Sequence, residues 1–126
     1  MKNLINYIED NLHKQYIWGQ MDCFMMILKY LEIGEDHYNK YKTLRGAVSY
    51  YKKHASKFDD WLKDHNYKEI KKNFEQNGDL IKVDDTPFCS WGIYYNSNVL
   101  VANHKKGICL EPIKLLNNFT AFRCYG

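Results

Sequence analysis

The hydrophobic periodicity of this 126-residue chain changes near Asn77-Gly78, and this change constrains the fold more than any other feature. Before that point, apolar residues recur every three or four positions, which is typical of amphipathic helices. After it, short β-branched and aromatic runs alternate with turn-forming segments, which is typical of strands. Helices followed by strands predict an α+β fold, with a helical part (residues 1–77) packed on an antiparallel sheet (residues 78–126).

The first two helices have recognisable ends. A stripe that begins at Leu4 predicts a helix up to about Leu12. Asp22 is a favourable N-cap residue, so Cys23 is expected to be the first residue of the second helix, which Gly34 would end. Further helical segments are expected at residues 44–53, 57–64 and 67–76.

Five strands are expected at residues 80–83, 90–95, 99–103, 108–111 and 120–124. Residues 96–98 are interpreted as a three-residue hairpin loop, which pairs Tyr95 with Val99. In that register Ser90 lies directly across from His104, with Cβ atoms about 5 Å apart. A loop one residue shorter or longer would break this juxtaposition.

Length and composition predict one domain over residues 1–126 and exclude several classes of protein. With 45% hydrophobic and 26% charged residues, the chain is expected to fold rather than remain disordered. The formal charge of +3 is too small and too scattered to indicate a nucleic-acid partner. The longest apolar run, residues 24–28, is too short to span a membrane, and the N-terminus lacks the apolar core of a signal peptide.

The four cysteines, at positions 23, 89, 109 and 124, form no Cys-x-x-Cys pair, so we expect no metal or other cofactor. We also expect the cysteines to be free thiols. Cys23 differs from the others because it opens a helix. Unpaired amides and the helix dipole favour thiolate there, and the same amides could receive an oxyanion during acyl transfer. A buried, structural role for Cys23 is an equally good interpretation.

Several segments taken together resemble the NlpC-type branch of papain-like cysteine peptidases. The matching motifs are Tyr16-x-Trp18-Gly19-x-x-Asp22-Cys23, Gly78-Asp79-Leu80-Ile81 and Trp91-Gly92-Ile93-Tyr94. Within this superfamily the chain is most similar to small proteins encoded in phage and prophage tail-gene regions, through Arg45-Gly46 and Phe122-Arg123. The resemblance covers roughly residues 12–125. It implies a papain-like fold, a nucleophilic cysteine and binding residues at Tyr16, Trp18, Gln20, Asp22 and Trp91.

The chain departs from the family pattern at the position of the catalytic base. Where the peptidases carry their catalytic histidine, this sequence has Ser90, whose hydroxyl cannot serve as a general base for a thiol near neutral pH. The third polar residue of the peptidase triad would fall near Ala102 or Asn103. His104 is the alternative base if the three-residue hairpin loop brings it across from Ser90.

Other motif residues have structural alternatives. Trp18 and Trp91 could line a groove for sugar or peptide or pack in the core. Asp79 could orient a catalytic group or close a turn onto the backbone, and Arg123 could pair with an acid such as Asp22 or Glu111.

Three functions follow as hypotheses. The leading one is a catalytically degenerate, phage-encoded component that binds tail or virion proteins, located in the virion or, during assembly, in the host cytoplasm. The alternative is an active cysteine peptidase or amidase that cleaves peptidoglycan stem peptides, with Cys23 as nucleophile, His104 as base and oxyanion donors near Gln20. A cytosolic immunity or inhibitor protein also suits the size and mild charge of the chain.

Overall fold

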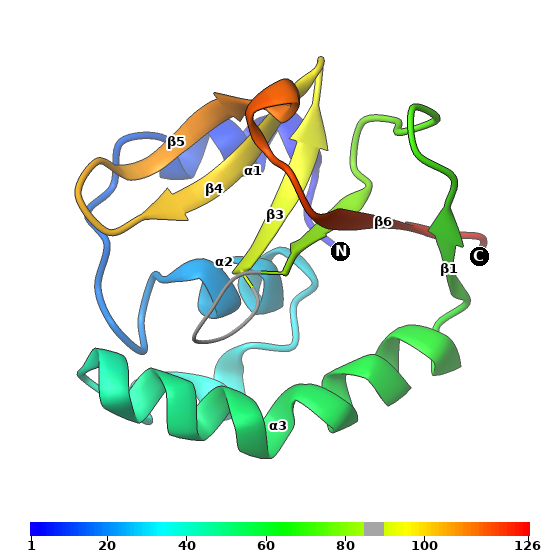
Figure 1. Ribbon diagram of the computed structural model, residues 1–126. Coiled ribbons are helices and arrows are strands. Elements are labelled where there is room, and N and C mark those ends of the chain that lie inside the picture. The colour runs from blue at the N-terminus through cyan, green and yellow to red at the C-terminus, as the bar shows by residue number, and fades with distance from the viewer. Residues whose placement is uncertain (85–89) are drawn as a thin grey trace.

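A computed structural model describes residues 1–84 and 90–126, and Cys89 lies outside these ranges. The fold is α+β, as predicted, with an antiparallel six-stranded sheet in the order β1-β6-β2-β3-β4-β5 (Figure 1). The helices are α1 (Leu4–Asn11), α2 (Cys23–Tyr30) and α3 (Leu44–Asp64), with short 3-10 turns η1 (Glu35–His37) and η2 (Ile113–Leu115). The strands are β1 (Tyr67–Ile70), β2 (Leu80–Val83), β3 (Ser90–Tyr95), β4 (Asn98–Asn103), β5 (Gly107–Pro112) and β6 (Phe119–Cys124).

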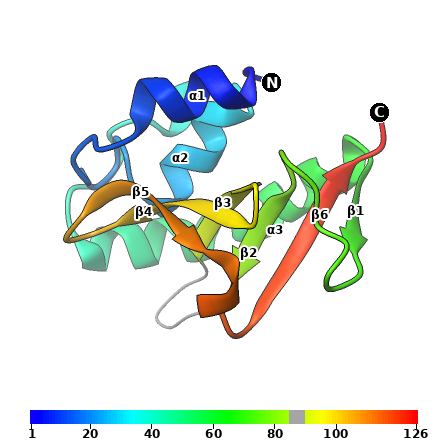
Figure 2. The same cartoon turned by 90° about the horizontal axis from the view of Figure 1, so that it is seen from above.

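Helix α2 is the centre of the core. Seven of its eight residues are buried, and it packs on β3 and β4, with α1 beside it (Figure 2). Helix α3 crosses below α2 (Figure 1), where Phe58 makes edge-to-face contacts with Phe24 and Trp91. Because α2 is enclosed by the sheet and two helices, the position of its first residue, Cys23, is tightly fixed.

Three expectations about the helices are wrong. Helix α2 ends at Tyr30 rather than at Gly34, and Glu32 (φ +61°) takes the left-handed conformation that ends it. Residues 44–53 and 57–64 belong to one helix, α3, because neither Gly nor Pro interrupts the chain between them. Residues 67–76, expected to be helical, contain strand β1, so the sheet begins inside the part that was assigned to helices (residues 1–77). Asn66 (φ +62°) turns the chain after α3, and β1 then pairs with β6, which outweighs the local helical pattern.

The β3–β4 hairpin has a two-residue turn instead of the expected three-residue loop. Asn96 and Ser97 both have positive φ values (+47° and +65°), as the tight turns that match the twist of a hairpin require. Tyr95 therefore pairs with Asn98 and Tyr94 with Val99. The predicted register is wrong by one residue, and continuing the observed one would set Ser90 opposite residue 103 rather than His104.

None of the helices in the described part of the chain has the length and apolar character that a bilayer crossing requires.

Candidate functional site

Cys23 is the first residue of α2, and Asp22 is its N-cap, as the sequence predicts. The carboxylate of Asp22 accepts hydrogen bonds from the backbone N–H groups of Phe24 (3.1 Å) and Met25 (2.8 Å). These bonds satisfy amides of the first helical turn that have no partner within the helix. Two amides of the first helical turn, those of Phe24 and Met25, are therefore already occupied by Asp22 and cannot receive an oxyanion.

Asp22 also holds the loop around the cysteine in place. Its second oxygen accepts hydrogen bonds from the Gly19 N–H (2.8 Å) and from the Tyr41 hydroxyl (2.6 Å), and the residue is only 1% exposed. Gly19 has a φ of +77°, and a Cβ at this position would overlap the carbonyl oxygen of Tyr41. Sequence reasoning missed Tyr41, because no spacing rule connects a loop tyrosine to an acid 19 positions earlier.

The Cys23 thiol is buried (5% exposed) and forms hydrogen bonds with the side chains of Tyr16 and Ser90. Burial, and then the negative charge of Asp22, raise the pKa of Cys23 to about 12, although the hydrogen bonds from Tyr16 and Ser90 act in the opposite direction. The expectation that the helix start favours thiolate is therefore opposed by desolvation and by the adjacent N-cap carboxylate. Near neutral pH the group is a protonated thiol.

His104 is close to this site but contacts a different group. Its ring centroid lies 5.4 Å from that of Tyr16 and 5.5 Å from that of Trp18, and these two rings are themselves 4.8 Å apart. His104 is exposed, whereas Tyr16 and Trp18 are half-buried. Among the described residues, Tyr16 and Ser90 are the side-chain hydrogen-bond partners of Cys23, and His104 is not one of them.

The remaining predicted binding residues lie elsewhere. Trp91 is 1% exposed and donates from Nε1 to the Tyr51 hydroxyl (3.2 Å), so it is part of the core. Gln20 donates a long, exposed hydrogen bond to Asn39 (3.4 Å). The structure thus brings together Tyr16, Asp22, Cys23 and Ser90, with Trp18 and His104 beside Tyr16.

Asp79 of the Gly78-Asp79 motif and Arg123 of the Phe122-Arg123 motif contact each other rather than the Cys23 thiol. Arg123 donates to both carboxylate oxygens of Asp79, at 2.9 Å from Nε and 2.8 Å from Nη2, rather than to Asp22 or Glu111. Asp79 also accepts from the Gln76 N–H (2.8 Å), which closes a turn onto the backbone as the sequence suggested. This ion pair, between a buried carboxylate and a partly exposed guanidinium, ties the start of β2 to β6 and has a structural role.

Within residues 1–84 and 90–126, no three His, Cys, Asp or Glu side chains converge in a way that could hold a metal ion.

No curated protein matches the chain. The model of one protein family, described as a domain of unknown function (DUF6950), matches residues 1–124. Because this match spans nearly the whole chain, the protein belongs to the DUF6950 family.

Proposed function

We propose that this protein is a papain-like domain of the NlpC type whose cysteine site is catalytically degenerate, and that it acts as a phage tail-associated or virion component. The observation that carries the proposal is the state of Cys23. Its thiol is buried, protonated at neutral pH and hydrogen-bonded to Tyr16 and Ser90. An activated cysteine needs the reverse: a lowered pKa or a base in contact with its sulfur.

The motif residues around Cys23 support a scaffold role because packing accounts for them. Asp22 caps α2 and binds Tyr41, and Gly19 leaves room for the Tyr41 backbone. A Cβ on Gly46 would lie 3.0 Å from the Tyr41 Cβ, so this glycine also fits the same loop. The folding of the loop around the start of α2 therefore accounts for these motif residues, and no reaction at the thiol is needed to explain them.

The resemblance to small proteins of tail-gene regions supplies the biological setting. A domain of this kind would contribute its surface to assembly, with tail or virion proteins as partners. The expected locations are the particle and the host cytoplasm during assembly.

Alkylation of the thiols by iodoacetamide tests the state of Cys23. A pKa of about 12 leaves roughly a thousandth of the thiolate that an ordinary cysteine has near neutral pH, so Cys23 should be alkylated at least about 100-fold more slowly than the exposed Cys124. Mass spectrometry of tryptic peptides measures both rates in one sample. Fast, selective modification of Cys23 would contradict the proposal.

The substitution Ser90→His tests the papain-like geometry. It places an imidazole at the position whose side chain hydrogen-bonds to Cys23, so alkylation of Cys23 should accelerate at neutral pH. Ser49→His, at an exposed position of α3, is the matched control and should leave the rate unchanged. Equal rates in both variants would remove the argument that Ser90 replaces a base.

The assembly role is tested in the phage or prophage that carries the gene. Particles should contain the protein by mass spectrometry, deletion of the gene should impair tail assembly, and a Cys23→Ala allele should restore it. Normal particles formed without the gene would refute the role.

One observation favours the second candidate, an active peptidase or amidase: His104 contacts the Tyr16 ring, and Tyr16 hydrogen-bonds to Cys23. If a rearrangement brought His104 to the thiol, Cys23 would react selectively, and His104→Ala would abolish both that reactivity and the cleavage of peptidoglycan stem peptides. Under the degenerate-site proposal, His104→Ala changes neither.

A further inference from the structure

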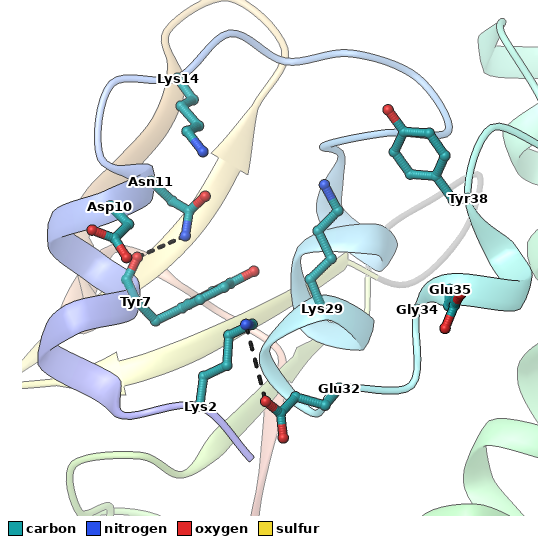
Figure 3. Close-up of a pocket in the computed structure, with 10 residues that line it drawn as sticks. All are labelled: Lys2, Tyr7, Asp10, Asn11, Lys14, Lys29, Glu32, Gly34, Glu35 and Tyr38. Atoms are coloured by element: carbon teal, nitrogen blue, oxygen red, sulfur yellow. Dashed lines mark hydrogen bonds and ion pairs between the residues drawn. The ribbon is translucent and has the colours of Figure 1, made fainter.

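A second, unrelated feature of the molecule is a cavity of about 660 Å³ between α1, α2 and η1 (Figure 3). Its volume lies within the range of small-molecule sites. Its lining combines apolar surface with charged side chains: Lys2, Lys14 and Lys29 are the basic lining residues, Asp10, Glu32 and Glu35 are the acidic ones, and Tyr7, Asn11, Gly34 and Tyr38 complete the lining.

Two of the lysines face the cavity without a carboxylate partner. Within the described residues, neither Lys14 nor Lys29 forms an ion pair, and their side chains extend toward one another in Figure 3. The ammonium of Lys29 lies 5.3 Å from the ring centroid of Tyr38. Burial and then the charge of Lys14 lower the pKa of Lys29, although Asp22 acts in the opposite direction. The two ammonium groups therefore repel each other across the cavity.

The acidic lining residues do not neutralise this pair. Glu32 is bound by the N-terminal ammonium (3.0 Å) and Lys2 (4.0 Å), and it lies at the other end of the cavity from Lys14. Glu35 is directed away from Lys29 in Figure 3, and within the described residues neither Asp10 nor Glu35 forms an ion pair with a lysine. The two lysines without a carboxylate partner, Lys14 and Lys29, thus lie at the same end of the cavity as the Tyr38 side chain, away from Glu32.

We propose that this end of the cavity binds the phosphate group of a small phosphate ester. Lysine ammonium groups bind phosphate as point charges, and an anion between them would relieve their mutual repulsion. The Tyr38 hydroxyl offers a further donor, and the cavity is larger than a phosphate ion, which leaves room for an organic group beside the Tyr7 and Tyr38 rings. This inference does not depend on Cys23 or on the proposed function.

The test measures binding by the full chain with isothermal calorimetry, using inorganic phosphate and phenyl phosphate as probes and phenol as the uncharged comparison. Both phosphates should bind, phenyl phosphate more tightly, and phenol should not. Lys14→Gln and Lys29→Gln should each weaken phosphate binding about tenfold or more. Lys29→Arg should retain binding because it keeps the charge.

Lys114→Gln is the matched control, because it removes the same charge from an exposed position on η2. It should bind phosphate like the unaltered protein. Circular dichroism shows that each variant is folded before titration. The proposal is overturned if phosphate fails to bind the folded protein, if sodium chloride of equal ionic strength produces the same heat, or if Lys14→Gln, Lys29→Gln and Lys114→Gln all bind alike.

Discussion

Replacing Asp22 by alanine should destabilise the protein more than any other substitution around the cysteine. The carboxylate accepts four hydrogen bonds, three from backbone N–H groups and one from Tyr41, and is almost fully buried. Loss of an N-cap residue costs about 0.5–2 kcal/mol. Hydrogen bonds to charged groups contribute about 1.5–3 kcal/mol each, but they are not additive within one network. We therefore expect Asp22→Ala to lower the free energy of unfolding by about 3–5 kcal/mol.

Tyr41→Phe is the matched variant, because it removes one of the four bonds and leaves Asp22 with its three amide partners. It should cost about 1–2 kcal/mol. Urea unfolding near neutral pH, followed by far-ultraviolet circular dichroism, measures both values, since a single domain of this size is expected to unfold in two states. If Asp22→Ala costs less than about 1 kcal/mol, or no more than Tyr41→Phe, Asp22 does not organise this loop.

Three other perturbations are expected to have measurable effects. Gly92→Ala should cost about 2–3 kcal/mol in urea unfolding, because its Cβ would overlap a Val99 methyl group and lie 2.8 Å from the Leu100 carbonyl oxygen; a neutral effect would contradict that packing. Arg123→Met should cost about 3 kcal/mol, because it leaves the buried Asp79 carboxylate without its cation, and a loss below about 1 kcal/mol would count against the ion pair. The Cys23 thiol has a higher pKa in the folded protein than in the unfolded chain. The contribution of this difference to the free energy of unfolding is complete below about pH 9 and is lost as the pH rises toward 12. Between about pH 9.5 and 11, the unaltered protein should therefore lose about 2 kcal/mol more than Cys23→Ala, and parallel curves would contradict the raised pKa.

The parts of the fold that the sequence predicted are those with local signals. Asp22 is a strong capping residue beside an apolar stripe, so the start of α2 was predictable to the residue. The prediction of a helix at residues 67–76 was wrong because β1 has only four residues and is stabilised by its pairing with β6, more than 50 positions later. Local periodicity contains no information about such a partner.

In the candidate site, too, the features with local sequence signals were predictable and those that depend on distant contacts were not. Cys23 and Ser90 were predicted to be neighbours from their motifs, and they are hydrogen-bonded. The environment of the thiol was not predictable, because it depends on desolvation and on the position of Tyr16 in an irregular loop. The placement of His104 failed through one residue of turn length, because Asn96 and Ser97 both adopt positive φ values that a two-residue turn requires.

The order of the strands has a consequence for synthesis of the chain. β6, made from residues 119–124, lies between β1 and β2, so it bridges the two parts of the sheet (Figure 1). As the chain emerges from the ribosome, β2 through β5 can assemble as successive hairpins, whereas β1 has no neighbour in the sheet until residues 119–124 have emerged. A chain without residues 119–124 would have two open strand edges, those of β1 and β2, and such edges are prone to pairing with other chains.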